Sequence, residues 1–200
     1  MITAILLATH QRDSGRDLCP PHPHGLPDTT AGAHALRGIV DRLIVVVRPE
    51  AFVQATRERQ QGVEVLGCPH THEGVAAQLA YTIRVTGGAA GWIVAATGPA
   101  ALEPPVIDAM AQQLRRGALL VVPRLRTHRH HPLGFGRAFG PQLSALTHDS
   151  GLIALLRRAR RLVRRVPHEP VIPAHTGVAV PTSRWRARAQ PAPLAHPARE

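Results

Sequence analysis

Cysteine and histidine side chains gather in two short loops of this sequence. Each loop places one cysteine close to two histidines, and these donors are the ligands that zinc prefers in proteins. The alternative is a set of exposed loop histidines, because the chain has 13 histidines and lacks the paired Cys-x-x-Cys spacing of strong zinc sites. The candidate ligands are Cys19, His22, His24, Cys68, His70, His72 and, near the chain end, His175.

A second group of residues has the chemistry to hold phosphate. Ser14 and Gly15 stand between Arg12 and Arg16, soon after the apolar run of residues 2–8. Backbone N–H groups at a glycine turn can approach phosphate closely, and an arginine guanidinium matches its geometry. The sequence therefore predicts an anion-binding turn after the first apolar run, where open α/β sheets bind nucleotide phosphates.

Positive charge in this chain comes from arginine alone. The formal net charge is +11, and the 24 basic residues include no lysine, so any catalytic role that requires lysine is excluded. The arginine-rich residues 157–165 and the segment 184–188 around Trp185 could grip phosphates and stack a base. A solvated helix end and a floppy tail explain both segments more simply, so nucleic acid is not expected as the main partner.

The cysteine content and the hydropathy pattern indicate the compartment. Two cysteines are too few for a disulfide framework. The first apolar run is far shorter than the roughly 18 residues of a membrane span, and no basic segment precedes it. We expect a soluble, cytoplasmic protein without membrane association.

The elements that must position these groups follow from the hydrophobic pattern. Short apolar runs typical of strands buried in a parallel sheet lie at residues 2–8, 43–47, 63–66, 92–96 and 118–122. Helical spacing lies between them, at residues 29–39, 50–60, 73–84 and 105–116. This alternation predicts a three-layer, Rossmann-like, doubly wound and mostly parallel α/β sheet, with its ligand crevice at the carboxyl ends of the strands.

The pattern becomes less regular after residue 123. We expect a polar loop at 124–131, a short strand at 132–135 and a short helix at 139–146. A longer helix, capped by Asp149 or Ser150, should reach about residue 161. Its predicted inner face consists of Leu152, Ile153, Leu155 and Leu156.

The chain length suits one domain. With 200 residues and 44% hydrophobic content, residues 1–180 are assigned to a single domain. Residues 181–200 are rich in Pro, Ala and Arg without periodicity, so a disordered tail is expected there.

Three parts of the sequence resemble the MobA/MocA-like molybdenum-cofactor nucleotidyltransferases. Residues 4–8 are similar to the strand that opens the family's Leu-Ala-Ala-Gly-x-Ser-x-Arg-x-Gly signature, and residues 68–79 look like its Asn-Pro-x-x-x-Glu-Gly-x-x-x-Ser-Leu segment. Residues 129–137 and 148–152 resemble its Gly-His-Pro-Val-Leu-Phe-Gly-Arg and Gly-Asp-x-Gly blocks. The resemblance spans roughly residues 2–180.

The resemblance implies a nucleotide-diphospho-sugar transferase-like fold and transfer of CMP or GMP, from CTP or GTP with Mg²⁺, to a molybdopterin-like acceptor. It also implies a molybdoenzyme as maturation partner. The implied nucleotide contacts are Ala8, Thr9, His10, Arg12, Ser14, Gly15, Arg16, Glu73, Gly74, Gln78 and Gly98, and the implied acceptor contacts are His131, Pro132 and Arg137. Glu73 and Gly74 fit the capped start of a helix as well, and Pro132 fits an edge strand equally.

Several positions depart from the family's pattern. His10 stands where the signature has its first glycine, and Cys19 lies near the position of its lysine. Residues 97–99, Thr-Gly-Pro, replace a Gly-Asp pair, and residues 173–176 replace an Asp-x-Asp near the chain end.

Carboxylates hold Mg²⁺ in proteins, so these losses predict a pseudoenzyme with reduced or lost transferase activity. No catalytic residue is assigned. The carboxylates that could restore a metal site are Asp13, Asp17 and Glu103. The alternatives are a Zn²⁺-binding module on the same fold and a basic nucleic-acid-binding protein.

Overall fold

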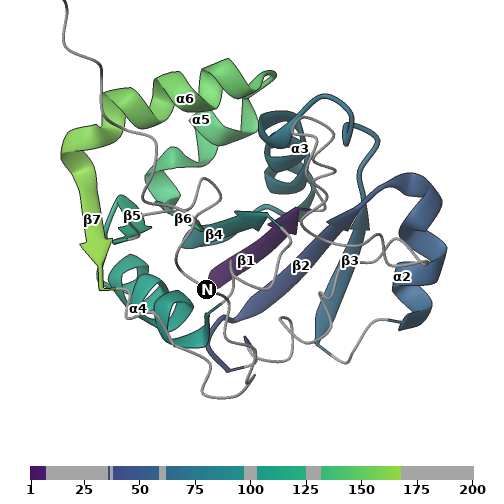
Figure 1. The fold of residues 1–200 in the computed structure, drawn as a ribbon, viewed down its shortest axis with the longest axis horizontal. Coiled ribbons are helices and arrows are strands. Elements are labelled where there is room, and N and C mark those ends of the chain that lie inside the picture. The colour runs from purple at the N-terminus through teal and green to yellow at the C-terminus, as the bar shows by residue number, and fades with distance from the viewer. Residues whose placement is uncertain (8–35, 37, 59–61, 97–102, 125–131, 168–200) are drawn as a thin grey trace, which may run out of the picture. The chain divides into compact units, whose positions relative to one another are not determined.

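Apolar runs form the central strands of one sheet. The computed structural model describes residues 1–7, 36, 38–58, 62–96, 103–124 and 132–167. Within these residues, seven strands pair in the order β3-β2-β1-β4-β6-β5-β7 (Figure 1). Their bounds are β1 Ile2–Leu7, β2 Arg42–Val47, β3 Val63–Gly67, β4 Gly91–Ala96, β5 Leu120–Pro123, β6 Leu133–Gly136 and β7 Val163–Val166.

All of these strands except β6 run in one direction. β1 pairs in parallel with β2 and β4, and β2 pairs in parallel with β3. β6 is antiparallel to both β4 and β5, and β7 is parallel to β5. The carboxyl ends of the six codirectional strands therefore share one side of the sheet, the carboxyl edge, and their amino ends share the amino edge. The predicted mostly parallel sheet is confirmed.

Helices connect and cover the strands. α3 and α4 are the longest, and α4 begins with two prolines, whose fixed φ suits the first turn of a helix. The helices are α2 Phe52–Glu58, α3 Val75–Thr86, α4 Pro104–Arg115, α5 Gly140–Ser144 and α6 Asp149–Arg158, with 3₁₀ turns η1 Pro49–Ala51, η3 Arg137–Phe139 and η4 Ala159–Leu162.

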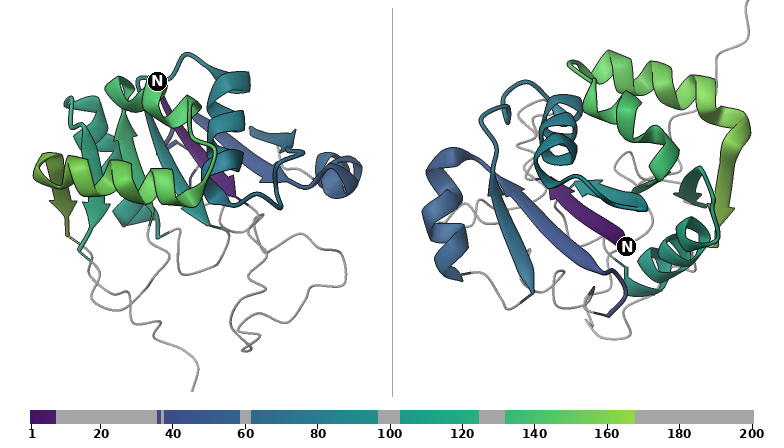
Figure 2. Two further views of the ribbon diagram at one scale, coloured as in Figure 1. Left: turned by 90° about the horizontal axis from the view of Figure 1, so that it is seen from above. Right: turned by 180° about the vertical axis from the view of Figure 1, so that it is seen from behind.

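Alternation along the strands gives the sheet two apolar faces. In β1, Ile2 and Leu6 belong to the cluster that packs on α4, whereas Ile5 and Leu7 belong to the cluster that packs on α3, α5 and α6. Successive strand residues point to opposite faces, so a run that is apolar throughout must be covered on both sides. Figures 1 and 2 show these helices on the two faces of the sheet, which gives the predicted three layers.

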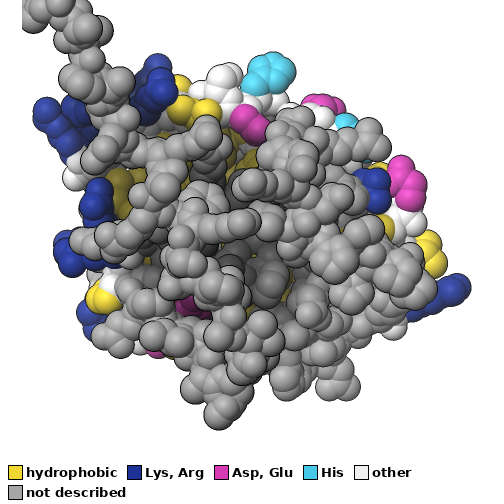
Figure 3. Space-filling model, viewed as in Figure 1, with side chains coloured by type: hydrophobic (Ala, Val, Ile, Leu, Met, Phe, Trp, Pro, Cys, Tyr) yellow, Lys and Arg dark blue, Asp and Glu magenta, His cyan; other side chains and the backbone are white. Residues whose placement is uncertain are grey.

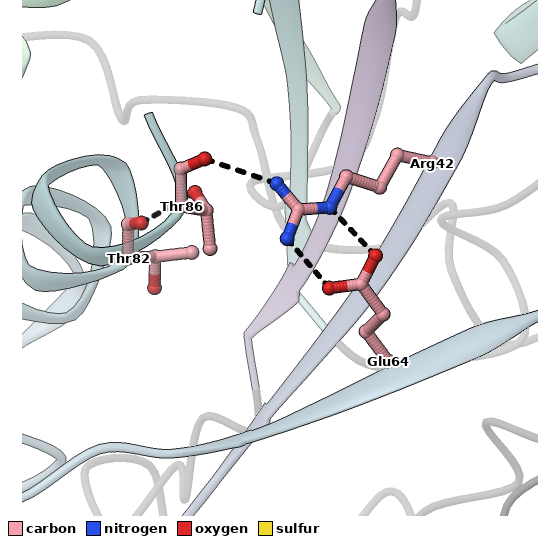
Figure 4. Close-up of polar contacts among 4 residues, drawn as sticks. All are labelled: Arg42, Glu64, Thr82 and Thr86. Atoms are coloured by element: carbon pink, nitrogen blue, oxygen red, sulfur yellow. Dashed lines mark hydrogen bonds and ion pairs between the residues drawn. The ribbon is translucent and has the colours of Figure 1, made fainter. Parts of the chain in front are cut away.

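An arginine at the start of β2 ties three elements together at the amino edge. Arg42 Nε and Nη2 each donate to the Glu64 carboxylate of β3 at 2.6 Å, and Nη1 donates to the Thr86 carbonyl at the end of α3 at 3.0 Å (Figure 4). Such paired bonds use the planar fork of arginine. This contact fixes the C-terminus of α3 relative to the strands, and so helps to set the position of its N-terminus.

The pattern predicted six of the seven described strands and missed β7. All five apolar runs form strands, residues 132–135 overlap β6, and α2, α3 and α4 lie within or next to their predicted ranges. The helix predicted to reach residue 161 ends at Arg158 and continues as η4, and Ile153, placed on its inner face, is 49% exposed. β7 was not predicted, since its Val-Arg-Arg-Val sequence continues the arginine run.

The predicted helix 29–39 falls almost wholly outside the described residues, as does the predicted tail. Residues Met1–His168 form one compact unit. No helix in the described part of the chain is long and apolar enough to cross a membrane.

Candidate functional site

The loop of residues 68–74 joins the end of β3 to the start of α3, so it lies at the carboxyl edge of the sheet. Its first residue is tied to the neighbouring strand, because the Cys68 N–H donates to the Val47 carbonyl at 2.9 Å. β1, β2 and β4 end at the same edge. The loop and the ends of these strands therefore share the edge at which open α/β sheets bind ligands.

A carboxylate from a distant part of the chain holds the start of α3. Asp149 Oδ1, at the first turn of α6, accepts a hydrogen bond from the Ala76 N–H at 2.7 Å. Gly74 precedes α3 with φ of 106° and ψ of 179°, a region open almost only to glycine. A Cβ at Gly74 would lie 2.7 Å from Asp149 Oδ2, so the glycine is required by the backbone and by its neighbour.

Glu73 does not cap α3, so its sequence-based interpretation as a helix cap is wrong. Its Oε1 lies 2.8 Å from His70 Nδ1, and its N–H donates to the His70 carbonyl at 3.1 Å. The His70 ring in turn meets the edge of Tyr81 at a centroid distance of 5.6 Å. Bonds between His70 and Glu73 therefore hold the loop together. The carboxylate that the N-terminus of α3 favours is that of Asp149.

Gln78 supports the loop from inside. Its side chain is buried, with the residue 2% exposed, and Nε2 donates to the Thr71 carbonyl at 3.3 Å. Among the described residues, Gln78 Oε1 and Thr71 Oγ1 are buried and accept no hydrogen bond. Whether Gln78 also contacts a nucleotide stays a prediction.

Three of the seven proposed zinc ligands, Cys68, His70 and His72, can be located. Cys68 is fully buried, and burial raises the pKa of its thiol, which disfavours the thiolate that binds metal. His70 bonds to Glu73, and the described ranges contain no group of three or more His, Cys, Asp or Glu side chains able to hold a metal ion. The other candidate ligands, Cys19, His22, His24 and His175, lie outside the described residues, so the zinc hypothesis stays a prediction.

The structure separates two of the proposed acceptor contacts. Pro132 precedes β6 and is buried, and because β6 is antiparallel to β4, Pro132 lies towards the carboxyl edge. Arg137 follows β6 at the amino edge, where its N–H donates to the Ala90 carbonyl at 3.0 Å. Five strand residues span about 17 Å. Pro132 and Arg137 therefore lie towards opposite edges of the sheet, and a contact of Pro132 with an acceptor stays a prediction.

The remaining proposed contacts fall on residues that the structure does not describe. They are the nucleotide contacts Ala8, Thr9, His10, Arg12, Ser14, Gly15, Arg16 and Gly98 and the acceptor contact His131. The contact of Asp149 with the start of α3 was not predicted. The Asp-x-Gly block of residues 149–151 identified Asp149, but only as a cap for its own helix, and no local signal links it to Gly74.

Comparisons with known proteins agree with this architecture. The family model described as a MobA-like NTP transferase domain matches residues 24–168. A search of curated proteins found no match.

Solved structures provide the second comparison. The Rv0371C complex with manganese from Mycobacterium tuberculosis H37Rv aligns with a TM-score of 0.62 at 21% identity, covering 84% of this chain and 87% of that chain. A nucleotidyl transferase from Methanothermobacter thermautotroptrophicus, Mth528, gives 0.61 at 18% identity, with coverages of 84% and 88%. CMP:2-keto-3-deoxy-manno-octonic acid synthetase complexed with CTP gives 0.57 at 13% identity, with coverages of 84% and 89%.

At these identities the structural likeness shows the fold alone, whereas the family model covers most of the chain. Together with the β3–α3 loop at the carboxyl edge, the match identifies the chain as a member of the family of MobA-like NTP transferase domains.

Proposed function

We propose that this chain binds a nucleoside triphosphate at the carboxyl edge and is a molybdenum-cofactor nucleotidyltransferase-like protein with strongly reduced transferase activity. The observation that carries the proposal is the hydrogen bond from Ala76 N–H to Asp149, which holds the start of α3 and its loop in place. A backbone fixed at this edge would meet a ligand with little rearrangement, which lowers the cost of binding. This fixed loop supports the proposed nucleotide site.

The loss of activity rests on the residues that would drive transfer. The chain has no lysine, and Thr-Gly-Pro at 97–99 stands where the family has Gly-Asp. At the carboxyl edge, the Glu73 carboxylate bonds to the His70 ring, and the Asp149 carboxylate accepts a hydrogen bond from the Ala76 N–H. Family chemistry implies a divalent metal, and the described residues contain no group of three or more ligands for one.

The residual reaction would be attack by an acceptor phosphate oxygen on the α-phosphorus of CTP or GTP. The bond between the α- and β-phosphates breaks, and pyrophosphate leaves. Arg12, Ser14, Gly15 and Arg16 would hold the triphosphate, and Pro132 would line the acceptor side. The same proposal includes a molybdopterin-like acceptor and Mg²⁺ as the supplied metal. It also includes a cytoplasmic location and a molybdoenzyme that receives the product.

Thermal unfolding with CTP or GTP, each with and without Mg²⁺, tests binding. A nucleotide at 100 times its dissociation constant should stabilise the fold by about 2.7 kcal/mol and raise the melting temperature. Only one of the two bases should do so strongly, because a formed pocket discriminates between them. No shift with either nucleotide would contradict the proposal.

Pyrophosphate release with a molybdopterin acceptor tests the loss of activity. Turnover should fall well below the rate of about 1 s⁻¹ at the low end of ordinary enzymes. Pro99→Asp restores the family's Gly-Asp pair after β4 and should raise the Mg²⁺-dependent rate. An unsubstituted chain that already turns over at an ordinary rate would refute the reduced activity.

A further inference from the structure

A groove on the β5–β7 side of the sheet is lined by arginines from two elements that are far apart in the sequence. One wall is the end of α4 and its turn into β5, and the other is η4 and the start of β7. The groove has a volume of about 520 Å³. We call it the arginine groove, and its lining residues are Gln113, Arg116, Gly117, Ala118, Leu119, Arg161, Leu162, Val163 and Arg164.

This groove is separate from the nucleotide crevice. β5 and β7 pair in parallel from Leu120 and Val163 onward, and both run in the same direction as β4. The lining residues Ala118 and Leu119 precede β5, and Arg161 and Leu162 precede β7. The groove therefore lies at the amino edge, on the opposite side of the sheet from the β3–α3 loop.

The positive charge of the groove is not neutralised by neighbouring carboxylates. Among the described residues, no Asp or Glu lines it, and the sequence of residues 150–168 contains none. Within the described ranges, the ion pairs are Arg42 with Glu64, His70 with Glu73 and Arg115 with Asp41, so none includes Arg116, Arg161 or Arg164. Three unpaired guanidinium groups around one cavity repel one another, and a bound anion would relieve that repulsion.

The charge continues beyond the groove. Six of the nine residues 157–165 are arginines, and all six are exposed. Figure 3 shows arginine side chains gathered along the left margin, where Figure 1 places β7, α4 and the end of α6. A small phosphate compound could occupy the groove but would leave the rest of this strip unpaired. A chain of regularly spaced phosphates matches both the groove and the strip.

Two leucines add apolar surface to the groove. Leu119 and Leu162 line it and remain 38% and 47% exposed. Sugar and base faces can cover such surface while guanidinium groups hold the phosphates. Protection of an exposed sheet edge would explain arginines on β7, but it does not explain Arg116, which comes from the end of α4 and lines the same groove.

We propose that the arginine groove binds the phosphate backbone of a nucleic-acid strand. Arg116 holds it from the α4 wall, and Arg161 and Arg164 hold it from the β7 wall. The interaction reads charge and spacing rather than base sequence, since phosphate contacts carry no direct sequence information.

Fluorescence anisotropy of the full chain with a labelled oligothymidylate of about 20 nucleotides, longer than common single-strand sites, tests this assignment. Arg161→Gln with Arg164→Gln removes two charges from the groove. Arg48→Gln with Arg57→Gln removes two charges from the η1–α2 segment next to β3, at the other end of the sheet, and is the matched control. Both variants retain every other arginine, so the total charge is equal.

The groove pair should weaken binding about tenfold at near-physiological salt and reduce the salt dependence by about 1.4 in log–log slope, or 0.7 for each lost phosphate contact. The control pair should change both far less. Arg116→Gln, on the other wall, should weaken binding independently, which guards against a folding defect of the β7 variant.

Three results would overturn the proposal. The first is no binding at about 0.1 M salt, where phosphate contacts still act. The second is equal weakening by the groove pair and the control pair, which would mean attraction to net charge alone. The third is competition by polyglutamate or tripolyphosphate as strong as that by unlabelled oligothymidylate, which would assign the groove to an acidic protein or to a small phosphate compound.

Discussion

Gly74 and Asp149 show how two residues far apart in sequence fix one turn. The Asp149 carboxylate lies so close to residue 74 that any side chain there would clash with it. The hydrogen bond at 2.7 Å then supplies an acceptor to an N–H group of the first helical turn. Neither residue achieves this alone, so their effects on stability should be coupled.

Replacement of Gly74 by alanine should destabilise the fold by about 3 kcal/mol. The reasons are a backbone conformation that costs alanine about 1–3 kcal/mol and a clash with the Asp149 carboxylate. Urea unfolding of the two proteins measures the difference in the free energy of unfolding.

Gly87→Ala is the matched control at the other end of α3. Gly87 also has a positive φ, 45°, with ψ of −176°, but a Cβ there would meet nothing within 4 Å. Its replacement should cost only the backbone strain, about 1–2 kcal/mol. Equal costs at Gly74 and Gly87 would show that the contact with Asp149 contributes nothing.

At the scale of elements, apolar continuity predicted the strands with neighbours on both sides. β1 and β2 are buried almost throughout, so their sequences carry the signal directly. Among the described strands, β7 pairs with β5 alone, and two of its four residues are exposed arginines. Its sequence therefore resembles the preceding helix end more closely than a buried strand.

The candidate site was predictable only in part. Motif resemblance located Glu73, Gly74 and the segment that includes Asp149, but local patterns could not give the partners of these side chains. The contact between Asp149 and Ala76 joins residues 73 apart in the chain, and the opposite placement of Pro132 and Arg137 depends on the antiparallel direction of β6. Both follow from tertiary structure, which spacing does not encode.

The ion pair between β2 and β3 should make stability depend on pH. The bonds from Arg42 lower the pKa of Glu64 below its ordinary value of 4.5. A lowered folded-state pKa means that the stabilisation is fully present above the unfolded-state value and is lost as the pH falls through the folded-state value. Because the Glu64 side chain is 51% exposed, solvent screening limits its contribution to less than about 1 kcal/mol.

Melting temperatures of the wild type and Glu64→Gln between neutral and acidic pH measure this effect. The variant should be less stable at neutral pH, and the difference should vanish well below pH 4.5. Glu50→Gln, at an exposed residue of η1, is the control. A difference between the wild type and Glu64→Gln that is constant across the pH range would contradict the role of the carboxylate charge.

At the scale of the whole chain, the sheet separates two kinds of anion chemistry. The β3–α3 loop, the proposed nucleotide site, lies at the carboxyl edge, and the arginine groove lies at the amino edge. The excess of arginine is therefore not spread evenly over the described elements. Because the two sites lie on opposite sides of the sheet, substitutions in one should leave ligand binding at the other unchanged.

Titration calorimetry of CTP and GTP, with Mg²⁺, into the wild type, Asp149→Ala and the neighbouring Ser150→Ala tests retained nucleotide binding most directly. One nucleotide should bind the wild type and Ser150→Ala equally. Loss of the Asp149 hydrogen bond, worth about 1–2 kcal/mol for a cap of this kind, should weaken that binding roughly tenfold in Asp149→Ala. A wild type that binds neither nucleotide, or an Asp149→Ala variant that binds as tightly as the wild type, would contradict the nucleotide site at the β3–α3 loop.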